Sequence, residues 1–125
     1  MSTKFLEIKN ISKKFGNVIA LDNVSLSISK SELFSLLGSS GCGKSTLLRI
    51  IAGFEKPDSG SIILDGEDIT NLPPHLRPLN MMFQNYALFP HLNISQNIEF
   101  GLKEENLPKN EILERTREIL NLLEL

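Results

Sequence analysis

The most informative stretch of the sequence is Gly38-Ser39-Ser40-Gly41-Cys42-Gly43-Lys44-Ser45-Thr46. It matches the pattern G-x-x-x-x-G-K-[ST], which is that of a phosphate-binding loop. The nearly continuous apolar run 33–38 comes before it and is typical of a strand buried on both faces of a parallel sheet. After it, apolar residues follow helical spacing over 44–52. We therefore predict a strand, a loop and a helix in that order, with Gly53 ending the helix.

The residue types in this loop suit a phosphate group. Its glycines let the backbone adopt positive φ, so that successive N–H groups point into one concavity. The following helix adds its unpaired N–H groups and its positive dipole end. We expect Lys44 to reach the β- and γ-phosphates, Ser45 to give its hydroxyl to Mg²⁺, and Thr46 to contact the outer phosphates. The simpler alternative is a Gly/Ser-rich turn that happens to start a helix.

The residues around the loop predict further strands. Phe5, Ile8 and Ile11 are expected to begin an edge strand. Apolar residues alternate with serines over 24–29, which predicts a strand with one solvent-exposed face. The strands of this N-terminal part are expected to be antiparallel. Beyond the helix, an Asp-Gly pair within 61–69 predicts a hairpin.

The second half of the chain predicts mainly helix. Prolines in 72–78 predict a loop, because proline lacks the N–H group that a helix or a sheet would use. Residues 81–83 are expected to form a short buried strand. Ser95 is expected to cap a short helix, and a long amphipathic helix is expected after Pro108.

Composition indicates a single soluble domain. The 125 residues carry 13 Lys or Arg and 15 Asp or Glu, a net charge of −2. Residues 1–60 carry eight basic and five acidic side chains, and residues 61–125 carry five and ten, so neither half has the basic density that nucleic-acid backbones require. One cysteine, no leader pattern and no apolar stretch of roughly 18 residues indicate a cytoplasmic protein.

Two stretches around the loop carry a resemblance that covers essentially the whole chain. Residues 11–28, ISKKFGNVIALDNVSLSI, together with the loop and the hairpin, resemble the ATP-binding subunits of ABC transporters. Residues 73–102, PPHLRPLNMMFQNYALFPHLNISQNIEFGL, are similar to the importer branch that serves polyamines, above all putrescine importers. The resemblance implies the α/β fold of P-loop NTPases of the ABC type, here its N-terminal part. That part would hold an antiparallel β-subdomain, the start of a parallel core sheet and the beginning of a helical subdomain.

The resemblance also implies a nucleotide site that extends beyond the loop, with ATP and Mg²⁺ as cofactors. Phe15 matches the aromatic position that stacks on adenine, and Ala20 is a weaker candidate for the adenine wall. Gln84 matches the glutamine that helps to hold Mg²⁺ or its water. A core phenylalanine and an ordinary surface glutamine are the alternatives. The implied nucleotide-binding set is Phe15, Ala20, Gly38, Ser39, Ser40, Gly41, Cys42, Gly43, Lys44, Ser45, Thr46 and Gln84, with Ser45 and Gln84 at the metal.

Residues 86–90, YALFP, match the patch that docks on coupling helices of transmembrane subunits. The alternative is a loop tucked into its own core. The implied partners are a second ATP-binding subunit in a homodimer, the transmembrane permease subunits through Tyr86–Pro90 and, indirectly, an extracytoplasmic polyamine-binding protein. Nucleic acid is not among them. The implied location is peripheral, on the cytoplasmic face of the inner membrane.

Several other residues are set aside. Residues 62–67, IILDGE, superficially resemble an apolar strand that ends in a magnesium Asp and a catalytic Glu, but the Asp-Gly pair favours a hairpin. His75 and His91 are interpreted as surface residues. Cys42 is interpreted as filling a variable loop position, and no Cys/His cluster suits zinc.

The resemblance leads us to expect three further elements, none of which lies in residues 1–125: an LSGGQ-type loop, a strand ending in Asp-Glu, and a switch His. We therefore interpret 1–125 as part of an ABC nucleotide-binding domain without a catalytic residue, the catalytic Glu being expected beyond Leu125. The final helix, which has no Gly, Asn or Pro stop, agrees with a truncated chain.

The predicted function is that of the ATP-binding subunit of an ABC importer, coupling ATP binding and hydrolysis to uptake of a polyamine, with putrescine favoured. The chain alone is expected to bind nucleotide better than it cleaves it, because hydrolysis also needs a positioned water. The alternatives are a soluble ABC-type ATPase that is not coupled to transport, and a non-enzymatic nucleotide-binding fragment.

Overall fold

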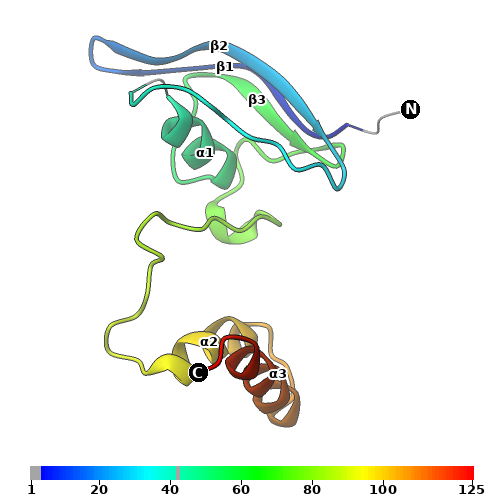
Figure 1. The fold of residues 1–125 in the computed structure, drawn as a ribbon. Coiled ribbons are helices and arrows are strands. Elements are labelled where there is room, and N and C mark those ends of the chain that lie inside the picture. The colour runs from blue at the N-terminus through cyan, green and yellow to red at the C-terminus, as the bar shows by residue number, and fades with distance from the viewer. Residues whose placement is uncertain (1–3, 42) are drawn as a thin grey trace. The chain divides into compact units, whose positions relative to one another are not determined.

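The computed structural model describes residues 4–41 and 43–125 (Figure 1). The chain divides into two units, one ending at Met81 and the other running from Met82 to Leu125. The first unit contains β1 (Lys4–Phe15), β2 (Val18–Ser29), α1 (Lys44–Ala52), β3 (Ser59–Leu64), β4 (Glu67–Asp68) and the 3₁₀ turn η1 (Pro74–Leu76). The second unit contains α2 (Ile94–Glu104) and α3 (Lys109–Leu122).

β1 lies inside a four-stranded antiparallel sheet with the order β2-β1-β3-β4. The prediction of an edge strand at its residues is therefore wrong, because β1 pairs on both sides: Ile8 lies opposite Leu26 of β2 and Ile62 of β3. The antiparallel arrangement is confirmed. The strand predicted from the alternation over 24–29 is also confirmed, as the second half of β2, which is the edge.

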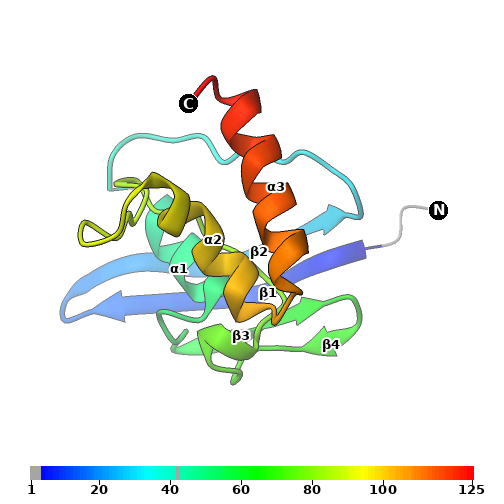
Figure 2. The same cartoon turned by 90° about the horizontal axis from the view of Figure 1, so that it is seen from below.

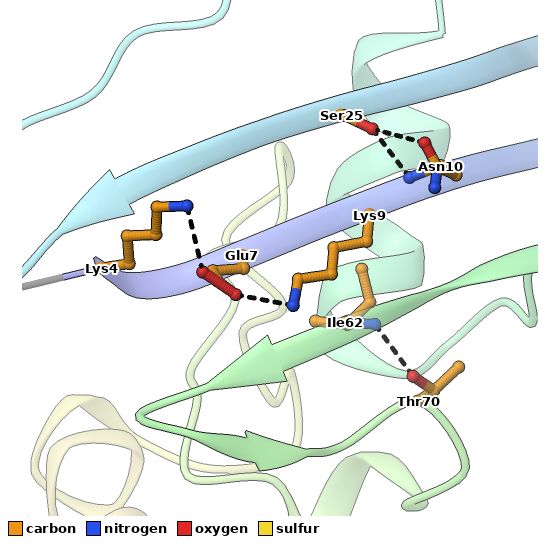
Figure 3. Close-up of polar contacts among 7 residues, drawn as sticks. All are labelled: Lys4, Glu7, Lys9, Asn10, Ser25, Ile62 and Thr70. Atoms are coloured by element: carbon orange, nitrogen blue, oxygen red, sulfur yellow. Dashed lines mark hydrogen bonds and ion pairs between the residues drawn. The ribbon is translucent and has the colours of Figure 1, made fainter.

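Several residues of β1 make polar contacts through their side chains or with side chains of neighbouring strands (Figure 3). The backbone N–H of Asn10 donates to the hydroxyl of Ser25 on β2 at 2.8 Å. The carboxylate of Glu7 lies between the ammonium groups of Lys9, at 2.9 Å, and Lys4, at 3.6 Å. The hydrogen bond from Lys9 holds the pKa of Glu7 below its ordinary value, so this carboxylate is charged at neutral pH.

α1 covers one face of the sheet (Figures 1 and 2). The predicted helix is confirmed, and Gly53 ends it with a left-handed φ of 90°. Leu47 and Ile50 of α1 are buried because their spacing places them on the face toward the strands. The core they join is aliphatic and consists of Ile8, Ile11, Leu21, Leu47, Ile50, Ile62, Leu64 and Ile69.

The hairpin predicted for 61–69 is confirmed. β3 and β4 pair antiparallel around Asp65 and Gly66, whose φ values of 49° and 85° are both positive, as a tight two-residue turn requires. The N–H of Ile62 donates to the hydroxyl of Thr70 at 2.9 Å, which continues the pairing just past β4 (Figure 3). Glu67 therefore lies exposed in a short hairpin strand.

Two other predicted strands are wrong. Residues 33–38 and 81–83 form no strand, and Leu33 and Leu37 are 97% and 93% exposed. A buried parallel strand needs neighbouring strands to pair with its N–H and C=O groups. Every pairing that the sheet of the described residues makes is antiparallel, and neither apolar run joins it.

The proline-rich segment 72–78, predicted as loop only, contains the turn η1, with proline at the first turn position. Arg77 follows and is only 7% exposed. Burial lowers the pKa of its guanidinium. The guanidinium donates four hydrogen bonds of 2.8–2.9 Å, to the carbonyl oxygens of Leu72, Ile50, Ile51 and Thr70. Arg77 therefore satisfies carbonyls at the end of α1 and fastens the following loop to that helix.

The second unit consists of two helices and the segment that leads into them. The prediction of Ser95 as the cap of the first helix is wrong, because Asn93 caps it and Ser95 lies inside α2. The Asn93 side chain accepts from the N–H of Gln96 at 2.8 Å, and the Gln96 side chain accepts from the N–H of Asn93 at 3.0 Å. The helix predicted after Pro108 is confirmed as α3. In the part of the chain that the structure describes, no helix has the length and apolar content to span a membrane.

Candidate functional site

The residues of the phosphate-binding loop surround the beginning of α1. Gly43 precedes the helix with a φ of 91°, and a Cβ at this position would lie 2.4 Å from the carbonyl oxygen of Ala20 on β2. Glycine is therefore required both for the backbone conformation and for the close approach to β2. α1 begins without a side-chain cap, so the amide donors of its first turn face the loop. This is the arrangement by which helix N-termini bind anions.

Lys44 connects the two ends of the loop. Its ammonium group donates to the carbonyl oxygens of Gly38 and Ser39, the second at 3.0 Å. The first residues of the loop are thereby held against the first residue of α1. A phosphate in the loop would compete with these carbonyls for the ammonium group, and a hydrogen bond to a charged acceptor is the stronger one.

A hollow of about 310 Å³ lies between the loop and the start of β2. The structure brings most of the predicted nucleotide-binding residues together here. Cys42, which was also predicted, lies outside the described residues. The lining residues are Val18, Ile19, Ala20, Ser40, Gly41, Gly43, Lys44, Ser45 and Thr46.

Val18 and Ile19 are site residues that the sequence analysis missed. Both are well exposed although they are large and aliphatic. They follow the turn at Gly16 and start β2, opposite the end of β1, where Phe15 pairs with Val18. Their position directly after a turn could have identified them as site residues. Large apolar residues at a sheet edge are exposed unless a ligand or partner covers them.

Phe15 does not line the hollow, but it lies next to it. The residue is 47% exposed, so the alternative of a core phenylalanine is wrong. The ammonium group of Lys13 lies 5.2 Å from the ring centroid. A hydrogen bond to Glu55 raises the pKa of Lys13, so this cation stays charged beside the ring.

Gln84 belongs to the second unit and lies exposed in the turn 84–87. The predicted docking segment, Tyr86–Pro90, follows directly. Tyr86, Leu88 and Phe89 are all exposed, so the alternative of a loop tucked into its own core is wrong. Gln84 is thus a surface residue of the second unit, and its role at the metal stays a prediction.

The docking segment is held from α2. The rings of Phe89 and Phe100 lie with their centroids 4.4 Å apart. The side chain of Asn97, which the sequence analysis also missed, binds the backbone of Phe89 in both directions. A hollow of about 500 Å³ with mainly apolar walls lies beside this segment, and its lining includes Leu88, Phe89, Ile94, Ile98, Leu123 and Leu125.

No group of three or more His, Cys, Asp or Glu side chains among the described residues is arranged to hold a metal ion. Ser45, whose hydroxyl oxygen could bind Mg²⁺, lies in the phosphate hollow. A magnesium ion bound mainly through phosphate oxygens and water needs only one or two protein ligands. The residues present thus fit a magnesium–nucleotide complex better than a metal bound by the protein alone.

Comparison with known proteins agrees with this geometry. The family model described as ABC transporter matches residues 21–125. The chain belongs to this family. The "Putrescine transport ATP-binding protein PotG" of Escherichia coli is 58% identical over 123 residues, which cover 98% of the chain and 33% of the relative. The "Spermidine/putrescine import ATP-binding protein PotA" of Thermotoga maritima is 57% identical over 120 residues, 96% of the chain and 33% of the relative.

The ABC fold is also found by structural comparison. An ATP-binding cassette solved as a dimer in a post-hydrolysis state with ADP and Pi superposes with a TM-score of 0.81 at 32% identity, covering 96% of this chain and 57% of that one. The predicted fold class, the ABC type of the α/β P-loop NTPases, is therefore confirmed. The chain spans about a third of the length of the curated relatives it matches.

Proposed function

We propose that this chain binds ATP with Mg²⁺ in the hollow between the phosphate-binding loop and β2. The observation that carries the proposal is the uncapped start of α1 behind a loop whose Gly43 fits only as glycine. Backbone donors and Lys44 would hold the phosphates, and Ser45 would supply a hydroxyl to the metal. Val18, Ala20 and Phe15 would form the apolar surface for the base. Magnesium would neutralise phosphate charge.

Residues 1–125 would correspond to the part of an ABC nucleotide-binding domain that holds nucleotide and contacts the transporter. The protein that contains them would be the ATPase of an importer, working as a homodimer at the cytoplasmic face of the membrane. The similarity to a dimeric cassette supports the second subunit. An LSGGQ-type loop and a catalytic Glu would be supplied by other parts of the assembly, so these residues alone would bind ATP better than they hydrolyse it.

The transported solute would be a polyamine, with putrescine favoured. Support comes from relatives named for putrescine and spermidine at 57–58% identity over nearly the whole chain. The subunit itself need not contact the solute, so its own net charge gives no argument for or against a cation. Restored uptake of labelled putrescine, but not of ferric iron, in a strain lacking its own putrescine ATPase subunit is the expected result. Restored iron uptake alone would overturn this assignment.

Nucleotide binding is tested by titrating the chain with a fluorescent ATP analogue in the presence of Mg²⁺. Lys44→Ala is expected to weaken binding by at least about tenfold, because one charge-assisted phosphate contact is lost. Lys109→Ala is the matched control, since Lys109 is likewise the first residue of a helix, α3, but lies in the other unit. Equal affinities for the wild-type chain and Lys44→Ala would show that the loop is not the nucleotide site.

Coupling to transport is tested at the docking segment. Phe89→Asp places a charge where an apolar surface would meet the transmembrane subunits, and co-purification with polyamine-importer transmembrane subunits should be lost. A soluble ABC-type ATPase would not depend on this residue. Undisturbed association of Phe89→Asp would therefore favour that alternative.

A further inference from the structure

The side chain of Asn97 binds the backbone just before α2 at four points. Its carbonyl oxygen accepts from the N–H of Phe89 at 3.0 Å. Its amide group contacts the carbonyl oxygens of Asn93 at 2.9 Å, Leu92 at 3.1 Å and Phe89 at 3.3 Å. One amide side chain thus uses both its acceptor and its donors on the chain between Phe89 and Asn93.

The docking segment, Tyr86–Pro90, has few other interactions that fix its conformation. Tyr86 and Ala87 both have positive φ, at 63° and 49°, a conformation that costs free energy in residues with a Cβ. The described backbone bonds nearby are short-range, such as the one from the N–H of Leu92 to the carbonyl oxygen of Phe89 at 3.1 Å. The side chains of the segment are mostly exposed and so gain little from burial. Its geometry therefore depends on a side chain outside it.

Asn97 is suited to this because its own position is fixed. It lies within α2, one residue after the capping box that Asn93 and Gln96 form. The helix start, the Asn97 side chain and the backbone of Phe89 are therefore connected by one network of hydrogen bonds. The ring of Phe89 packs against the ring of Phe100.

We propose that Asn97 is a positioning residue for the docking segment, and that it sets the direction in which Phe89 meets a transmembrane subunit. The inference rests on the proposed coupling to transport. Asn97 itself acts through the backbone of residues 89–93. Its loss should weaken association with the transmembrane subunits while ATP affinity stays unchanged, because the phosphate-binding loop belongs to the other unit.

Two variants separate the acceptor of Asn97 from its donors. Asn97→Asp keeps the size of the side chain and an acceptor for the N–H of Phe89, but its carboxylate cannot donate to the three carbonyls. Asn97→Leu loses both functions. Asn121→Leu is the matched control, because Asn121 is an exposed asparagine on α3.

The experiment measures three quantities for the full chain at a temperature at which circular dichroism shows all variants folded: amide hydrogen exchange at Phe89, ATP affinity, and co-purification with polyamine-importer transmembrane subunits. Asn97→Leu is expected to accelerate exchange at Phe89 about tenfold. Asn97→Asp is expected to keep that amide protected. Both variants should reduce co-purification at least about tenfold, with ATP affinity and the Asn121→Leu control unchanged.

The outcomes distinguish the inference from the proposed function. If Phe89→Asp abolishes co-purification and both Asn97 variants retain it, docking is supported and the positioning role of Asn97 is overturned. If Phe89→Asp also retains it, docking through this segment is wrong and the inference fails with it. If the Asn97 variants lose ATP affinity in proportion to co-purification, Asn97 stabilises the protein generally and positions nothing in particular.

Discussion

The two units of the chain are held together by different kinds of interaction. The first buries an aliphatic core that joins residues far apart in sequence, such as Ile8 of β1 and Ile62 of β3. In the described part of the second unit, Ile112 is the aliphatic side chain that is buried, and the side-chain hydrogen bonds described there span at most eight residues along the chain. The first unit is therefore stabilised by burial, and the second by caps and side-chain clamps that leave its apolar side chains available to partners.

Substitutions in the core of the first unit are expected to lower stability most. Ile62→Ala should lower the free energy of unfolding by about 3–4 kcal/mol, because it leaves a cavity in a fully buried site. Ile119→Ala, at an exposed position on α3, should cost less than about 1 kcal/mol. Urea denaturation measures both. Equal losses would show that the second unit has a core of its own.

Arg77→Met is expected to have the next largest effect and to lower the free energy of unfolding by about 2–3 kcal/mol. Four carbonyl oxygens lose their donor at a buried position. Arg117→Met, on the exposed side of α3, should change stability by less than about 0.5 kcal/mol. Hydrogen exchange at the end of α1 locates the effect. Unchanged exchange there would contradict the role given to Arg77.

A smaller loss is expected at the start of α2. Asn93→Ala removes the capping box and should cost about 1 kcal/mol, seen as faster exchange of the first amides of α2. Ser95→Ala lies inside the helix and should change stability by less than about 0.5 kcal/mol. A larger loss at Ser95 than at Asn93 would restore the sequence-based assignment of the cap.

Thr116→Val should be neutral or stabilising by up to about 1 kcal/mol, because the Thr116 hydroxyl is buried and has no hydrogen-bond partner among the described residues. Thr116→Ser, which keeps the hydroxyl and loses the methyl group, should destabilise instead. Thermal unfolding compares the two. A destabilised Thr116→Val would mean that the hydroxyl has an unrecognised partner.

The smallest expected effect is the acid dependence of the first unit. The pKa of Glu7, of Glu55 and of Asp68 is lowered, by hydrogen bonds from Lys9, Lys13 and Thr70 respectively. Their contribution to stability is complete above the ordinary values of 4.5 and 3.8 and is lost as the pH falls through the lowered values. Urea midpoints measured from pH 7 to pH 3 should fall less steeply in Asp68→Asn than in the wild type. An unchanged slope would contradict this contribution of Asp68.

Sequence patterns were most informative where a local rule alone decides the structure. The helix 44–52 with Gly53 at its end, the Asp65-Gly66 turn and the helix after Pro108 are all confirmed. The cap of α2 was misplaced because both Asn93 and Ser95 have capping side chains, and only the reciprocal bond with Gln96 selects Asn93. Val18 and Ile19 were missed because an apolar pair in a strand is most simply explained by burial.

The phosphate-binding loop, the helix behind it and the family could all be predicted from the residues alone, because they depend on glycine conformations and on residues close together in the chain. Which apolar runs become strands depends instead on how the chain packs. The runs 33–38 and 81–83 have strand composition but no paired neighbours, whereas β1, which looked like an edge, is paired on both sides. A strand is completed by hydrogen bonds to other strands, so its own residues cannot determine whether it forms.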